Sequence, residues 1–280
     1  MQKMNKTKTI VLIILLSILC IILIGLMIAF ISGVIPICKF NIDNDKVSKH
    51  LVYEKVYNSE LQSIDIDIML GNVEVLPSSD DNIHLSIYSD YELYEVSDTS
   101  SSLVVNFQEE EGFHFNFSKV GDKVEIYIPE DSGISFDISV DKGAVEVGNF
   151  LNSSFDITAD MGDVDVDGGK FIDVNSDMGD IFIGKVSRLN AELDLGDLEV
   201  ETVTEAVDIS CDMGNVSINE VHLLKDSAIT LSLGDLDINN LSGVYVDAKT
   251  DLGDVDVKDN NRNASYTLTI KNDMGDISIG

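Results

Sequence analysis

The chain has 280 residues, of which 50 are Asp or Glu and 18 are Lys or Arg, so its formal net charge is −32 at pH 7. Every acidic residue follows residue 37, together with 15 of the basic ones, and this part of the chain therefore carries −35. Because such a surface repels phosphates, the composition excludes nucleic acid as a partner.

The amino end is predicted to anchor the chain in a membrane. Three lysines precede a stretch without charges from Thr9 to Cys38, and a 26-residue helix within it would span about 39 Å. A cleaved signal peptide has an apolar region of only about 7–15 residues and a small-residue cleavage site, so we expect an uncleaved transmembrane helix over 10–37. The lysines place residues 1–9, a basic tail, in the cytoplasm and everything after the helix outside the membrane.

The chain between the anchor and the main repeats has a looser pattern. Residues 38–60 are predicted to be a juxtamembrane linker. Residues 61–142 hold one repeat phrase and then longer stretches that predict strands at Ile83–Tyr88, Leu103–Phe107, Phe113–Phe117 and Val124–Ile128. Pro129 follows the last of these and cannot donate to a sheet ladder. This segment is expected to form irregular β coils or a small antiparallel cap.

One short phrase recurs nine times: an alternating apolar strand, a Gly followed in eight copies by Asp or Asn, and a second alternating strand. From residue 143 onward the copies are about 19 residues apart, which is typical of a solenoid, propeller or array. The glycines of the nine phrases are Gly71, Gly143, Gly162, Gly179, Gly196, Gly214, Gly234, Gly253 and Gly275.

Apolar residues occupy odd positions before each Gly and even positions after it, so the strand alternation breaks once, at the Gly. Gly accepts positive φ and the following Asp or Asn suits a turn, so the Gly is predicted to be a structural bend that keeps the apolar side inward. We therefore expect an all-β fold, a parallel β-helix or solenoid with coils of about 19 residues over 143–280. An array of hairpins is the alternative, although a tight hairpin favours Asn-Gly or Asp-Gly, the reverse of the order here.

Two sets of Asp residues recur with the phrase. In a parallel solenoid successive coils lie about 4.8 Å apart, so each set would form a ladder of like charges. The ladders are interpreted either as turn chemistry and solubility or as a row of weak Ca²⁺ sites, because hard cations take carboxylate oxygens. No other metal and no cofactor is predicted. The first set is Asp160, Asp177, Asp194 and Asp212, with Asp251 and Asp273; the second is Asp163, Asp180 and Asp197, with Asp235, Asp254 and Asp276.

No catalytic constellation is found in the sequence. The four histidines and two arginines are scattered, and no nucleophile elbow, phosphate loop or zinc-ligand spacing occurs. Asp-x-Asp pairs recur with the repeat, so no single pair indicates a general acid and base. Cys211 falls in an apolar column and is expected to be a small buried core residue, and His222 is expected to be a solvated loop residue. No enzymatic activity is predicted.

The single amino-terminal span, the segment VEIYIPEDSGISFDISVDKGAVEV at 124–147 and the phrases DMGDVDV, DMGDIFI, DLGDLEV and DLGDVDV resemble the bacterial DUF4097 family, a family of unknown function whose members bear the name adhesin. The resemblance covers about residues 60–280. It implies a β-solenoid ectodomain on a Gram-positive-like cell surface. Some relatives are linked to envelope-stress systems, which implies an alternative function.

These features together predict a membrane-anchored, extracytoplasmic β-solenoid whose repetitive acidic surface binds a cationic or cell-envelope ligand without catalysis. The alternative is an accessory or sensor protein in a cell-envelope stress response. A glycan-active enzyme is a third reading, since β-helices also host such enzymes, but function has to be argued from a site.

Overall fold

The computed structural model describes residues 48, 50–58, 60–90, 94–107, 121–258 and 260–280. Residues 40–280 form one compact unit, separate from 1–39. The predicted basic tail and the predicted transmembrane helix at 10–37 lie outside the described residues. Within the described part, no helix is long and apolar enough to cross a membrane.

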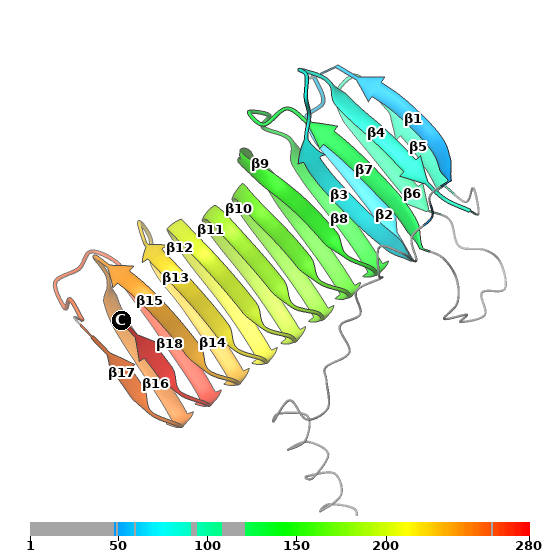
Figure 1. Ribbon diagram of the computed structural model, residues 1–280. Helices are drawn as coiled ribbons and strands as arrows, with labels where there is room; N and C mark the ends of the chain where they lie inside the picture. The colour runs from blue at the N-terminus through cyan, green and yellow to red at the C-terminus, as the bar shows by residue number, and fades with distance from the viewer. Residues whose placement is uncertain (1–47, 49, 59, 91–93, 108–120, 259) are drawn as a thin grey trace, which may run out of the picture. The chain divides into compact units, whose positions relative to one another are not determined.

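Every regular element of the described residues is a β-strand, and the nineteen strands belong to one hydrogen-bonded sheet (Figure 1). The prediction of an all-β fold with mostly parallel pairing is confirmed. The strands before the first long one are β1 Leu51–Tyr57, β2 Ser63–Ile68, β3 Gly71–Pro77, β4 Ile83–Tyr88, β5 Tyr94–Asp98, β6 Ser102–Phe107, β7 Asp122–Ile128 and β8 Ser135–Lys142. The others are β9 Val145–Met161, β10 Val164–Met178, β11 Ile181–Leu195, β12 Leu198–Met213, β13 Val216–His222, β14 Ser227–Leu233, β15 Leu236–Ser242, β16 Tyr245–Leu252, β17 Val255–Val257, β18 Thr267–Met274 and β19 Ile277–Ile279.

Successive repeats lie side by side as coils of a solenoid-like stack (Figure 1). Val164 of β10 pairs with Ile181 of β11, and Ile181 pairs with Leu198 of β12, in parallel each time. The offset between partners equals the interval between the glycines of the same two coils, so equivalent positions of the repeat stand in columns. The pairings described among β8 to β19 are all parallel, and the alternative of a hairpin array is therefore wrong.

The chain reverses direction at the nine repeat glycines, whose φ values lie between 141° and 158°. Gly196, with a φ of 154°, shows why a side chain does not fit. A Cβ built on it would lie 1.9 Å from the carbonyl oxygen of Gly179 in the adjacent coil, and residues with a Cβ rarely adopt such φ values. Leu193 before this bend and Leu198 after it are both buried, so the apolar side faces inward on both flanks.

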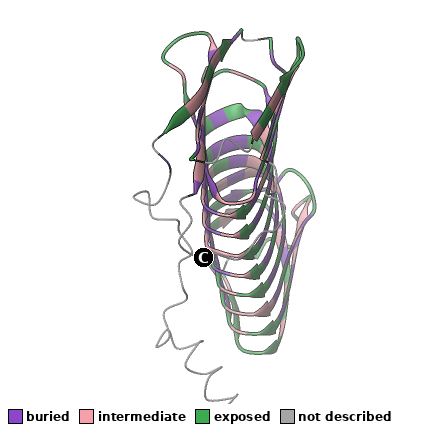
Figure 2. Ribbon diagram, turned by 90° about the vertical axis from the view of Figure 1, so that its right-hand side faces the viewer, coloured by how far each residue is buried: buried purple, intermediate pink, exposed green. Residues whose placement is uncertain are grey.

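The core is a set of apolar columns that runs along the stack. Each buried Val, Leu or Ile side chain contributes roughly 1.5–3 kcal/mol relative to an exposed one, so the alternation stabilises every coil. Figure 2 shows the coils one behind another, with buried and exposed residues alternating along them. Two of these columns, each member at most 2 % exposed, are Ile157, Val174, Ala191 and Ile209 before the bend and Val164, Ile181, Leu198 and Val216 after it.

Residues 61–142 combine parallel coils with antiparallel strands. The coil of β2 and β3 lies between that of β6 and β7 and that of β8 and β9. β4 runs antiparallel to β7 and to β1, and β5 runs antiparallel to β6. Three of the four strands predicted here correspond to β4, β6 and β7, and the fourth, Phe113–Phe117, lies outside the described residues.

The predicted juxtamembrane linker over 38–60 extends too far at its carboxyl end. Residues 51–57 form β1, which pairs with β4 from Leu51↔Tyr88 to Tyr57↔Ile83. Its sequence, LVYEKVY, is rich in β-branched and aromatic residues, which suit an edge strand.

The coils at the carboxyl end do not follow sequence order. β18 pairs with β14 on one side and with β16 on the other, and β19 lies in the same way between β15 and β17. The last coil in sequence is therefore inserted between two earlier ones, and the coil of β16 and β17 ends the stack (Figure 1). The bend glycines stack in the corresponding order, Gly234, Gly275 and Gly253.

Candidate functional site

One acidic column of the described residues lies on the outer face of the strands that precede the bends. Asp65 pairs with Asp137, Asp137 with Asp156, and Asp156 with Asp173, so four carboxylates follow one another from coil to coil. Each stands six residues before its bend glycine, an even offset that points the side chain outward. The flanking residues at odd offsets, such as Ile64 and Ile66, are buried.

A second column, of hydroxyl groups, runs beside the first. It holds Ser102, Ser63, Ser135 and Ser154, which are paired in that order. Phe171, the partner of Ser154 in the next coil, ends the column, and its ring lies 5.4 Å from the Arg188 guanidinium.

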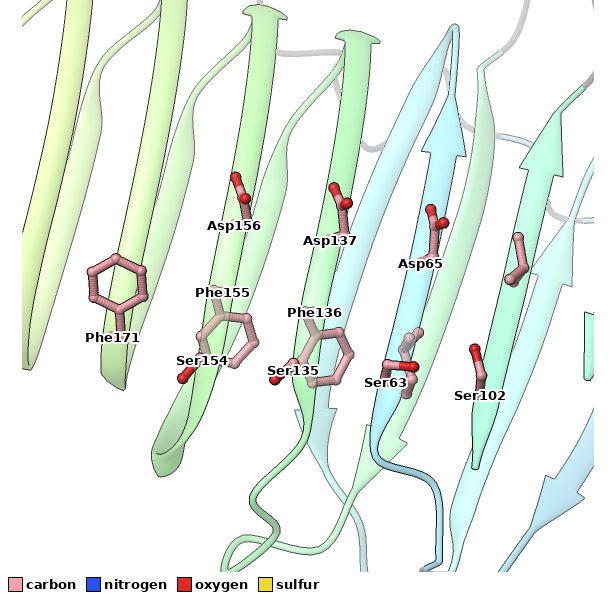
Figure 3. A pocket seen from close by; sticks show the side chains of 12 residues that line it. Ser63, Asp65, Ser102, Ser135, Phe136, Asp137, Ser154, Phe155, Asp156 and Phe171 are labelled. Atoms are coloured by element: carbon pink, nitrogen blue, oxygen red, sulfur yellow. The ribbon is translucent and has the colours of Figure 1, made fainter. Parts of the chain in front are cut away.

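The two columns line an open trough of about 420 Å³. Figure 3 shows Asp65, Asp137 and Asp156 in one row, the four serines in a parallel row, and Phe171 at one end. Beneath the surface the rings of Phe136 and Phe155 stack with their centroids 5.0 Å apart and are almost fully buried. The face above them is thus held by a rigid aromatic layer.

The trough is electrostatically unfavourable as it stands. Partial burial raises the pKa of Asp65, and the charges of Asp137 and Asp67 raise it further. Partial burial also raises the pKa of Asp156, with a further contribution from Asp173 and Asp137. Positively charged groups of a ligand would relieve this repulsion between carboxylates.

The polar groups of the trough are also free to bind. In the part of the chain that the structure describes, neither the four serine hydroxyls nor the carboxylates of Asp65, Asp137 and Asp156 have a hydrogen-bond partner. A row of hydroxyl donors therefore runs beside a row of carboxylate acceptors, an arrangement that suits hydrogen bonding to a ligand lying across several coils.

The Asp residues that follow the bends have a structural role. The Asp163 carboxylate accepts a hydrogen bond from the Asp180 amide at 3.1 Å, and the Asp180 carboxylate accepts one from the Asp197 amide at 3.2 Å. The series continues with Asp197 accepting from the Asn215 amide at 2.8 Å. Each carboxylate thus joins its own turn to the turn of the next coil.

The Asp residues two positions before the bends, Asp160, Asp177, Asp194 and Asp212, are exposed. Asp212 accepts a hydrogen bond from the Ser232 hydroxyl at 3.3 Å. Among the described residues, no three His, Cys, Asp or Glu side chains are grouped so that they could hold a metal ion. Ca²⁺ binding by these ladders stays a prediction.

The other residues singled out in the sequence lie apart from the trough. His222 is exposed, with Nδ1 3.1 Å from the Ser242 hydroxyl and Nε2 3.3 Å from a Glu220 carboxylate oxygen. Cys211 is 1 % exposed, and its burial, followed by the charges of Asp197 and Asp212, raises its pKa to about 11. Neither is placed to act as a base or nucleophile on a ligand in the trough.

Sequence reasoning missed the trough, although a signal for it was present. Asp65, Asp137, Asp156 and Asp173 share one offset from the bend glycine, as do Ser63, Ser135 and Ser154. The Asp residues next to the bends recur in more copies and are therefore the more prominent pattern in the sequence.

The stack of parallel coils, bent at glycines and faced with columns of polar residues, defines a repeat protein of the β-solenoid kind. The family model described as Toastrack DUF4097 matches residues 61–280, and the chain belongs to this family. Comparison with curated proteins gave no match.

Several solved structures are similar to this chain. A "putative adhesin" from Bacteroides fragilis has 18% identity and a TM-score of 0.35, covering 83% of this chain and 98% of its own. A "putative adhesin" from Parabacteroides merdae has 15% identity and a TM-score of 0.38, with coverage of 84% and 98%. A "putative lipid binding protein" from Parabacteroides distasonis has 10% identity and a TM-score of 0.42, with coverage of 83% and 98%. These superpositions are too loose to transfer a site or a ligand.

Proposed function

We propose that the protein is a membrane-anchored, extracytoplasmic β-solenoid that binds a cell-envelope ligand without chemical conversion. The trough carries this proposal, because it offers seven polar side chains, in two rows, that have no hydrogen-bond partner among the described residues. Its ligand is an extended molecule that lies across the coils and presents hydroxyl or ammonium groups to the serine and aspartate rows. The uncharged stretch from Thr9 to Cys38 supports the anchor.

Binding is tested with the fragment 40–280, a compact unit with its own core, by co-sedimentation with isolated Gram-positive cell walls. Asp137→Asn combined with Asp156→Asn should weaken binding at least about tenfold, because a hydrogen bond to a charged group contributes roughly 1.5–3 kcal/mol. The matched control is Asp237→Asn, an exposed carboxylate on β15. If the cell walls bind neither the natural fragment nor the double variant, or bind both equally, the trough is not the binding site.

The absence of catalysis is tested in the same mixtures. A binding protein should release no sugar fragments from the walls, however long the incubation. Release that stops when one carboxylate is replaced would identify a glycan-active enzyme instead.

The proposed topology is tested by proteolysis. Protease added to intact, wall-stripped cells should degrade residues 40–280 and spare a tag at the amino terminus, because the lysines near that end favour the cytoplasmic side. A protected carboxyl end would overturn the topology.

A further inference from the structure

The two ends of the stack are finished differently. At the amino end, β1 and β5 contact each other across the coil: the Lys55 ammonium lies 2.7 Å from a carboxylate oxygen of Asp98, and the Tyr94 hydroxyl donates to the Val52 carbonyl at 3.0 Å. The rings of Tyr53 and Tyr94 also meet, with centroids 6.2 Å apart. These contacts close the end of the core.

The carboxyl end is open. Among the described strands, β16 pairs only with β18 and β17 only with β19. Val255 is 43 % exposed, whereas Ile277, which occupies the same column one coil further in, is 1 % exposed. Leu252, at the bend of this coil, is 62 % exposed. The apolar columns of the core are therefore exposed at this end, where β16 and β17 form the last coil of the stack (Figure 1).

The outer edge of β16 is open over its second half. The Tyr245 amide donates to the Tyr266 carbonyl, toward β18, and alternation turns the main-chain groups of Val246, Ala248 and Thr250 away from β18. The Asn260 side chain satisfies both main-chain groups of Val246: it accepts a hydrogen bond from the Val246 amide at 3.0 Å and donates one to the Val246 carbonyl at 2.8 Å. The edge from Ala248 to Thr250 has no such cover among the described residues.

The series of hydrogen bonds made by the Asp residues after the bends also ends at this coil. The Asp254 amide donates a hydrogen bond to the Asp276 carboxylate at 2.8 Å. In the described part of the chain, however, no amide donates to the carboxylate of Asp254. The end coil thus presents the groups that inner coils use to bind the next coil.

We propose that this edge binds the same edge of a second copy, with the two β16 strands antiparallel around a two-fold axis near Thr250. The charges on the outer face of the strand suit this pairing, since they alternate as Asp247, Lys249 and Asp251. Within one chain the Lys249 ammonium lies 2.9 Å from an Asp251 carboxylate oxygen, and both groups are largely exposed. In a register centred on Thr250, Lys249 of each strand also lies opposite Asp251 of the other, so the two lysines and two aspartates form a favourable cross-strand network.

Two features of the chain direct this pairing. The Asn260 side chain ends the free edge at Val246, so it restricts the register to the second half of β16. Among the described residues, the contacts between β1 and β5 close the amino end, so that end offers no open coil for head-to-tail stacking. A two-fold contact gives a closed dimer rather than a filament.

The test is analytical ultracentrifugation of the fragment 40–280 over concentrations up to about 1 mM. We expect a reversible monomer–dimer equilibrium. Leu252→Asp, at a site on β16 that is 62 % exposed in the single chain and lies opposite Ala248 of the second copy in this register, should weaken the dimer at least tenfold. The matched control is Leu224→Asp, which changes a 59 % exposed Leu elsewhere on the surface and should leave the equilibrium unchanged.

Charge exchange tests the register. Lys249→Asp should weaken the dimer, and adding Asp251→Lys to the same chain should restore it. A monomer at every concentration, growth beyond the dimer, a dimer that survives Leu252→Asp, or a charge exchange without recovery would each overturn the proposal. The trough variants Asp137→Asn and Asp156→Asn should dimerise normally, so this proposal and that of wall binding fail separately.

Discussion

At the scale of single residues, the fold depends on the absence of a side chain at each bend. Gly196 combines a φ of 154° with a position where a Cβ would lie 1.9 Å from the backbone of the preceding coil, at the Gly179 carbonyl oxygen. Gly243 separates these two effects, because its φ is 78° but nothing lies within 4 Å of the place where its Cβ would be.

We expect Gly196→Ala to reduce the free energy of unfolding by more than about 3 kcal/mol, since strain and a backbone clash act together. Gly243→Ala should cost only about 1–2 kcal/mol, the usual penalty for a left-handed residue. Urea unfolding of the fragment 40–280 measures both. Equal losses in the two variants would show that close stacking of the bends does not contribute.

The same substitution, Ser to Ala, is expected to have opposite effects on stability at two buried serines. The Ser176 hydroxyl is buried without a hydrogen-bond partner among the described residues, so Ser176→Ala should stabilise the fragment by about 1 kcal/mol. The buried Ser153 hydroxyl donates to the Ser132 carbonyl at 2.8 Å and accepts from the Ile134 amide at 3.2 Å. Ser153→Ala should therefore destabilise it by about 1–3 kcal/mol. Thermal unfolding of the two variants checks the signs.

At the scale of the element, the carboxylates after the bends link one turn to the next. Asp197→Ala removes the acceptor for the Asn215 amide and should lower the free energy of unfolding by about 1 kcal/mol. Asp197→Asn keeps an acceptor and should be nearly neutral, and urea unfolding of the fragment 40–280 measures both.

Ca²⁺ binding by the Asp ladders makes a different prediction. Ca²⁺ should then raise the melting temperature more than Mg²⁺ in 0.15 M NaCl. Changing Asp177, Asp194 and Asp212 together to Asn should abolish that difference.

The acid column of the trough makes stability depend on pH. The folded-state pKa of Asp156 is raised, so its contribution to stability is fully present below the pKa of the unfolded chain and is lost as pH rises through the folded-state pKa. At low ionic strength, Asp156→Asn should raise the melting temperature at pH 7 by about 1–3 °C. The advantage over the natural chain should disappear as pH falls toward 4. A variant that melts lower at pH 7 would contradict the repulsion inferred here.

At the scale of the whole molecule, the inserted last coil changes what a truncation removes. Deleting 267–280 takes away β18 and β19, the only described neighbours of β16 and β17. The loss of strand signal by circular dichroism should therefore match that of a chain ending at residue 243, although the latter lacks 23 more residues. If deleting 267–280 removed only the strand signal of β18 and β19, the placement of these strands between the coils of β14–β15 and β16–β17 would be wrong.

The repeat phrase alone was sufficient to predict the all-β class and the inward columns. The period-two pattern on both sides of a residue such as Gly196 constrains local backbone and burial, and a repeated local constraint propagates along the chain. Three strands outside the regular repeats, β4, β6 and β7, were also found from their alternation. β1 was missed because LVYEKVY has partners only through β4, which is distant in sequence.

Tertiary structure alone decided which coil lies beside which. The coils bent at Gly234, Gly253 and Gly275 carry nearly the same phrase, so the local pattern is compatible with any order, and the insertion of β18 and β19 rests on long-range pairing. The trough likewise exists only once coils are in register, because Asp65 and Asp137 are 72 residues apart in sequence yet paired in the sheet. The sequence by itself determined what each coil buries and where it bends; the neighbours of each coil, and hence the open edge at β16, follow from contacts that no local pattern encodes.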